Sequence, residues 1–254
     1  MPLPPDYAAH LQRVDPDRWL AARFVEEEAA RDELLALYAL NDELARIGES
    51  VREPMLGEMR FAWWEEALDA ACAGKGGRGH PALEPLAPAL AAGRLPRAPL
   101  DRLIAARQAA DFVRAPFADE AALARWLEAT SGSLMAAAAV LLDPGAEGCD
   151  TAAAGRAWGW AGLLRASDHW AARGRRWTPA DWADPQDPAA LAATVRTKVD
   201  AALSEARDAL KGLPVAAFPA VAYATLARDY ARGRSPGDLS RRLRLLAAVS
   251  FGRL

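Results

Sequence analysis

The sequence of 254 residues contains only two cysteines and three histidines, and it lacks a long apolar run. Cys72 and Cys149 lie far apart in the chain and match no metal-ligand spacing, which excludes a disulfide framework and a structural zinc site. No Ser/His/Asp or Cys/His set suited to nucleophilic catalysis is legible. We expect a protein of a reducing compartment.

The sequence also contains no recognisable targeting or membrane-spanning segment. The longest apolar run covers residues 134–142, whereas about 20 residues are needed to cross a bilayer. The first fifteen residues carry several charges and do not resemble a secretory signal. The 34 acidic and 31 basic residues nearly balance, which argues against a general nucleic-acid binder. The sequence therefore predicts a soluble, cytoplasmic protein that binds no nucleic acid.

Apolar residues recur at three- and four-residue spacing almost everywhere, which predicts an all-α fold. The chain is long enough for one substantial core, so we expect a single helical domain over residues 1–254. The glycine-rich stretch 74–79 follows no strand and lacks a phosphate-loop ending, so we interpret it as a connector. Helices are predicted at residues 16–30, 31–52, 55–73, 100–114, 120–142, 151–173, 189–211, 217–231 and 236–249.

Three segments resemble the squalene and phytoene synthase family, in the family's own order. They are residues 31–49 (RDELLALYALNDELARIGE), residues 128–135 (EATSGSLM) and residues 155–179 (GRAWGWAGLLRASDHWAARGRRWTP). The resemblance implies a single-domain helical bundle of the isoprenoid (terpene) synthase type. It also implies a channel for prenyl substrates beside the second segment.

Members of that family condense two prenyl diphosphates, and the reaction starts with loss of diphosphate to magnesium. Magnesium prefers oxygen ligands in near-octahedral geometry, usually one or two carboxylates together with phosphate oxygens. Two aspartates four residues apart share one face of a helix, so two such helices can present paired carboxylates across a cavity. An active member should therefore carry two such pairs.

Both pairs are degenerate in this chain. Counted from Tyr38, the first motif places Ala45 where an aspartate belongs, and only Glu49 keeps a carboxylate. The second motif places Ala166 and Trp170 at its two aspartate positions. These replacements predict that no cofactor is bound and that catalysis is absent, so we name no catalytic residue and no metal ligand.

A divergent branch of the family, similar to mitochondrial complex I assembly factor six, has the same pattern. The resemblance is carried by residues 39–45, by residues 59–64 and above all by the triplet Leu164, Arg165 and Ala166. It implies a non-catalytic protein that assists assembly of respiratory complex I (NADH dehydrogenase). Its partners would be complex I subunits or assembly intermediates, and its place peripheral at the inner face of the membrane, with possible lipid contact.

Two alternatives remain open. One is an active magnesium-dependent prenyl transferase whose carboxylates come from Asp42, Glu43 or Asp168; it requires at least three carboxylates that converge on one cavity. The other is a carrier of an apolar ligand, which requires a long open pocket. A pure scaffold predicts instead that tryptophan side chains fill the space.

Six residues are candidates for a ligand pocket: Tyr38, Asn41, Glu49, Ser131, Arg165 and Arg175. For Glu49 we favour a simpler interpretation, an ion-pair ladder with Asp42 and Arg46 on a helix surface. Arg165 and Arg175 belong to a basic cluster that suits either phosphate recognition or a solvated helix end. Most of the nine tryptophans are expected in or beside the core.

Overall fold

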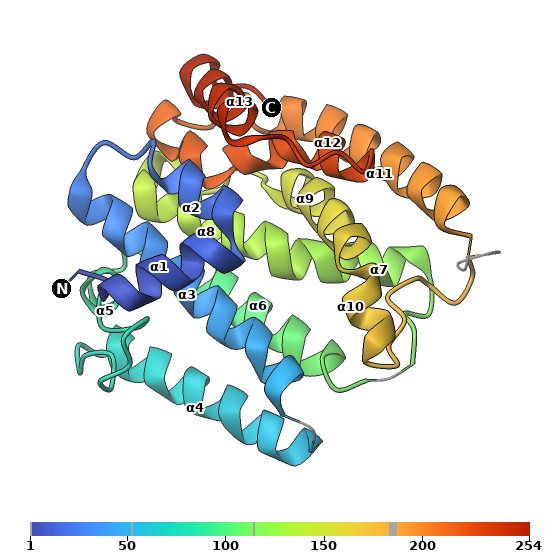
Figure 1. The fold of residues 1–254 in the computed structure, drawn as a ribbon. Coiled ribbons are helices and arrows are strands. Elements are labelled where there is room, and N and C mark those ends of the chain that lie inside the picture. The colour runs from blue at the N-terminus through green and yellow to red at the C-terminus, as the bar shows by residue number, and fades with distance from the viewer. Residues whose placement is uncertain (1, 52, 114, 183–186) are drawn as a thin grey trace.

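The fold is a bundle of helices, as the sequence predicts (Figure 1). The computed structural model describes residues 2–51, 53–113, 115–182 and 187–254, and within those ranges every regular element is helical. The longer helices are α1 (Pro5–Val14), α2 (Pro16–Ala22), α3 (Glu28–Ser50), α4 (Pro54–Cys72), α6 (Arg97–Ala110), α7 (Glu120–Leu127), α8 (Ser133–Leu142), α9 (Ala152–Arg165), α11 (Pro188–Ala209) and α13 (Asp238–Phe251). The short elements are α5 (Ala87–Ala91), α10 (Ser167–Ala172), α12 (Ala227–Ala231), the π-helical turn η1 (Glu128–Gly132) and the 3-10 turns η2 (Pro144–Ala146), η3 (Val215–Ala220) and η4 (Ala222–Leu226).

The core is built around α8, which is apolar on nearly all sides and runs through the middle of the bundle (Figure 1). It contacts α3, α6 and η3, and it buries Leu134, Met135 and Leu141. Beside it, α9 packs against α11, α12 and η1. Most tryptophans lie in or beside this core as predicted, with Trp64, Trp158, Trp160 and Trp177 buried. No helix in the described ranges is long and apolar enough to cross a membrane.

The predicted helix 16–30 is wrong in extent. The chain leaves α2 at Ala22 through three tight backbone hydrogen bonds, in which the amides of residues 23–25 donate to the carbonyls of residues 20–22. This turn buries the Val25 side chain, and the Arg31 guanidinium donates to the Val25 carbonyl at 3.3 Å. Helix α3 then starts at Glu28, and α1 is an element that the sequence prediction missed.

Two further predicted helices are interrupted. The segment 151–173 breaks at Ala166 into α9 and α10, and Gly174 (φ +64°) ends α10 in the left-handed conformation that glycine adopts without strain. The segment 217–231 consists mostly of 3-10 turns, because Pro219 lacks an amide hydrogen for a regular α-helix. The predicted ends at residues 52 and 114 lie outside the described residues.

Candidate functional site

A cavity of about 200 Å³ lies where α3, α6, α9 and α10 meet. It shares five residues with a wider mouth of about 650 Å³: Gly48, Glu49, Asp111, Arg173 and Arg175. We call the two together the α3–α10 cavity. Its inner part is also lined by Ala45, Arg107, Trp126, Leu163, His169 and Trp170, and its mouth by Val51, Phe112 and Ala172.

Close contact between α3 and α6 places two carboxylates, those of Glu49 and Asp111, at the cavity. Gly48 lies in the last turns of α3, and a Cβ atom there would be 2.7 Å from the Cβ of Asp111. The absence of a side chain at Gly48 therefore lets Asp111, at the end of α6, lie directly against α3. Glu49 follows on the same helix and faces the mouth. Arg107 lies one turn before Asp111, with its Nη1 3.7 Å from the Asp111 carboxylate.

Burial is the largest influence on the pKa values of Asp111 and Arg107, the charged pair of the inner cavity. It raises the pKa of Asp111, an effect that nearby Arg107 and Arg175 only partly oppose. Burial also lowers the pKa values of Arg107 and Arg175. One carboxylate oxygen of Asp111 and the Nε of Arg107 are buried without a hydrogen-bond partner among the described residues. The inner cavity is thus polar and incompletely satisfied within the chain, which is unusual for buried groups.

A second set of contacts crosses the mouth. His169 on α10 lies 3.3 Å from the Glu49 carboxylate and 2.8 Å from the Arg173 guanidinium. Arg175 donates to the carbonyl of Ala110 at 2.9 Å, and its guanidinium lies 4.5 Å from the centre of the Trp170 ring. These contacts hold α10 and the following segment against the ends of α3 and α6.

Trp170 occupies the second aspartate position of the second motif, and its side chain forms part of the cavity wall. Its ring meets that of Trp126 edge-on, with centroids 6.5 Å apart, while Arg175 covers it. Ala45 lines the cavity from the α3 side, one turn before Glu49. Ala166 does not line it and lies instead at the break between α9 and α10. Three of the four degenerate positions therefore surround one cavity.

The six candidate pocket residues do not converge. Only Glu49 and Arg175 line the α3–α10 cavity. Tyr38 is buried in the core, where its ring meets Tyr223 edge-on at 6.3 Å, and Asn41 is buried on the same helix. Ser131 lies in the π-helical turn η1, away from the cavity lining.

Arg165 points to a different part of the molecule. Its guanidinium lies 3.7 Å from the Asp17 carboxylate and 4.0 Å from the centre of the Tyr230 ring. Asp17 is buried and also accepts hydrogen bonds from the Tyr230 hydroxyl at 2.7 Å and from Arg241 at 3.2 Å. The predicted basic cluster is thus divided: Arg165 ties α9 to α2, whereas Arg173 and Arg175 line the cavity.

The predicted ion-pair ladder of Asp42, Arg46 and Glu49 is wrong. Asp42 bonds to His10 at 2.9 Å, and Glu49 contacts His169. Arg46 pairs with Glu43 instead, at 3.9 Å. The ladder fails because α1 and α10 pack near this face of α3 and supply other partners.

Sequence reasoning missed the buried pair of Arg107 and Asp111. The signal was present, since two opposite charges four residues apart sit in a helix with apolar neighbours. On a single helix this spacing is typical of an ordinary surface ion pair. Only the packing of α6 against α3 shows that Asp111 is buried and that most of the Arg107 side chain is covered.

Comparison with known families identifies the family to which the chain belongs. The sequence profile described as Squalene/phytoene synthase matches residues 11–246. The chain belongs to the squalene/phytoene synthase family. No curated protein matches its sequence.

Solved structures agree with the family at the level of the fold. The chain is similar to a dehydrosqualene synthase crystallised with a ligand, with a TM-score of 0.77 and 14% identity over 97% of this chain and 95% of that one. It is also similar to squalene synthase HpnC from Alicyclobacillus acidocaldarius, with a TM-score of 0.66 and 18% identity over 97% and 93% of the two chains. The expected isoprenoid synthase bundle is therefore confirmed.

The residues of this family member do not fit a magnesium site of the kind expected from its relatives. Among the described residues, only Glu49 and Asp111 bring carboxylates to the α3–α10 cavity, and Asp42, Glu43 and Asp168 do not line it. Within the described ranges, nowhere do three acidic, histidine or cysteine side chains cluster closely enough to hold a metal ion.

The charge of the lining opposes a divalent cation as well. Among the lining residues that the structure describes, three guanidinium groups, those of Arg107, Arg173 and Arg175, face two carboxylates. Like charges a few ångströms apart repel by several kcal/mol at an effective dielectric constant of about 20. The arrangement suits a small anion better than a metal ion, because arginine presents several donors in a planar fork.

Proposed function

We propose that this squalene/phytoene synthase-like protein is non-catalytic and assists assembly of respiratory complex I (NADH dehydrogenase). The observation that supports the absence of catalysis is the lining of the α3–α10 cavity. Ala45 and Trp170 stand where paired carboxylates are expected, and arginines surround the two carboxylates that remain. Diphosphate departure needs a divalent cation, and this lining offers it too few ligands.

The assembly role rests on the resemblance of residues 39–45, 59–64 and 164–166 to the branch similar to mitochondrial complex I assembly factor six. In this proposal the partners are complex I subunits or assembly intermediates. The protein acts from the cytoplasm, peripherally at the inner face of the membrane.

The geometry weighs against an apolar-ligand carrier. Charged side chains line both parts of the α3–α10 cavity, whereas typical small-molecule sites are mostly apolar. Deeper in the bundle, the Arg18 guanidinium lies 4.9 Å from the centre of the Tyr223 ring and 5.6 Å from that of Trp158. A buried cation in this aromatic cluster suits a packed scaffold better than an open apolar channel.

A deletion and rescue experiment tests the assembly role. We expect an organism that lacks this chain to lose assembled complex I on native gels, together with NADH dehydrogenase activity. The wild-type chain and Glu49→Ala should restore both equally, because Glu49 carries no chemistry in this proposal. Normal complex I in the deletion strain would contradict the assembly role. Failure of a folded Glu49→Ala variant to rescue would contradict the absence of catalysis.

A further inference from the structure

The helix α13 presents an apolar stripe to solvent on the side opposite its packed face. Leu239, Leu243 and Leu246 are 72%, 57% and 48% exposed. At 3.6 residues per turn they fall within about 60° of one another. Leu245 and Ala248, on the other side, are buried against the bundle. We call the three exposed leucines the α13 stripe; its orientation means that the fold itself gives these side chains no partner.

Ion pairs fix α13 in this orientation. Arg241 bonds to the buried Asp17 of α2 at 3.2 Å, and Arg244 lies 2.5 Å from Asp229 of α12. The helix also packs on η3 and η4. It lies at the outer edge of the bundle, at the opposite end from α4 (Figure 1). The stripe is therefore held outward by specific contacts on the packed side.

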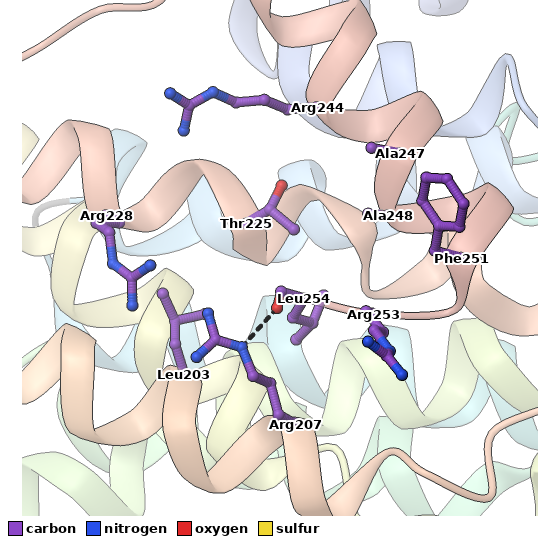
Figure 2. Close-up of a pocket in the computed structure, with 10 residues that line it drawn as sticks. All are labelled: Leu203, Arg207, Thr225, Arg228, Arg244, Ala247, Ala248, Phe251, Arg253 and Leu254. Carbon is purple, nitrogen blue, oxygen red and sulfur yellow. Dashed lines mark hydrogen bonds between the residues drawn. The ribbon is translucent and has the colours of Figure 1, made fainter.

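Cations border the stripe. Arg242 follows one flank of it on α13, and Arg234 precedes the helix; both are exposed. On the other flank lies a groove of about 610 Å³, which Figure 2 shows with four arginines around it. Of these, Arg244 and Arg228 are paired with carboxylates, the latter with Asp200 at 2.6 Å.

Of the remaining two groove arginines, Arg253 is free to contact an outside anion. Arg253 forms no side-chain hydrogen bond or ion pair with the described residues, whereas Arg207 donates to an oxygen of Leu254 at 2.7 Å. Phe251 is largely exposed at the groove edge and adds a further apolar side chain to this surface (Figure 2). Apolar residues flanked by unpaired arginines are typical of helices that lie in the interface of an anionic membrane.

We propose that α13 is a membrane-contacting helix, which inserts its leucine stripe into the surface of a bilayer containing anionic phospholipid. The arginines beside the stripe and in the groove contact the phosphate groups. An anionic lipid surface is the occupant that matches both features, because it offers apolar chains beneath a layer of negative charge. This inference deepens the proposed function by naming the surface that would hold the protein at the membrane.

Vesicle binding by the purified full-length chain tests the inference. We expect co-sedimentation with vesicles of phosphatidylcholine and phosphatidylglycerol, and much weaker binding to phosphatidylcholine alone. Leu239→Glu/Leu243→Glu should lower the partition coefficient by at least about tenfold, because inserting a single leucine is worth more than the about 1.4 kcal/mol of a tenfold change. Arg242→Gln/Arg253→Gln should lower it roughly fivefold per arginine on anionic vesicles only.

Helix α4 provides the matched control. Met55 and Met59 are also four residues apart and are 66% and 62% exposed, but they lie at the other end of the bundle (Figure 1). Met55→Glu/Met59→Glu should leave vesicle binding unchanged. Circular dichroism checks that each variant is folded, as expected for substitutions at exposed sites.

Three outcomes would overturn the inference: no vesicle binding by the wild type, equal binding to neutral and anionic vesicles, or equal losses in the α13 and α4 variants. If the α13 variant loses complex I assembly but the wild type never binds vesicles, the stripe is a protein-docking surface and the lipid inference is wrong. The vesicle assay contains no complex I, so its failure leaves the rescue experiment, and with it the proposed function, standing.

Discussion

The contact between α9 and the π-helical turn η1 predicts opposite effects for the same substitution at two glycines of one helix. A Cβ atom on Gly155 would overlap the backbone nitrogen and Cα of Gly132. A Cβ atom on Gly162, two turns later, would meet no atom within 4 Å. Both glycines lie inside α9, so alanine gains the same helix propensity at each.

The magnitudes follow from these surroundings. Overpacking typically costs about 1–3 kcal/mol, and the upper end applies at Gly155 because the overlapping atoms are backbone and cannot rotate away. The higher helix propensity of alanine stabilises the variant by about 1 kcal/mol. Gly155→Ala should therefore lower the free energy of unfolding by about 2 kcal/mol in total. Gly162→Ala should gain about 0.4–1 kcal/mol.

Thermal unfolding of the two variants beside the wild type is the assay. For a chain of this size 1 kcal/mol shifts Tm by about 2–4 °C, so Gly155→Ala should melt about 4–8 °C below the wild type. Gly162→Ala should melt at or slightly above the wild-type Tm. If both variants shift in the same direction by similar amounts, α9 does not approach η1 as closely as we describe, and the reasoning is refuted.

Two other predictions concern the buried charges. Asp17→Asn should lower the unfolding free energy in urea by about 2–4 kcal/mol, because it removes the buried carboxylate that faces Arg165 and Arg241, although Arg241 keeps its ion pair with Asp238. Tyr230→Phe should lose only about 1 kcal/mol; equal losses would contradict this network. Burial lowers the pKa of His80, so the unfolded chain takes up a proton first as the pH falls below about 6.5, and stability should decrease there. His80→Asn, which keeps an acceptor for the Ala82 amide, should show a smaller decrease between about pH 7.5 and about pH 5.5 in urea titrations; an equal decrease would show that His80 is not the group responsible.

Periodicity was sufficient to predict the helical fold, and short motifs were sufficient to indicate the family. Motif counting alone also identified Ala45, Glu49 and Trp170 as degenerate motif positions. These features depend on local spacing, which a single sequence displays directly. The break at Ala166 did not follow, since neither proline nor glycine marks it and residues 152–172 are compatible with one continuous helix.

Features that depend on contact between distant segments could not be predicted. Arg107 and Asp111 look like a surface pair until α6 is placed against Gly48 of α3. Arg165 looks like part of one basic cluster until α9 is placed beside Asp17 of α2. In both cases the segment that packs against the charged residue lies far away in the sequence. Burial changes the role of the charge, and burial is a property of the packed bundle.

The central claim is that this synthase-like fold performs no magnesium-dependent diphosphate chemistry. The most direct test incubates the purified chain with magnesium and farnesyl or geranylgeranyl diphosphate and measures diphosphate release. We predict no release above the rate without protein, for the wild type and for Glu49→Ala alike. Release by the wild type that Glu49→Ala abolishes would contradict the claim and would identify the chain as a prenyl transferase.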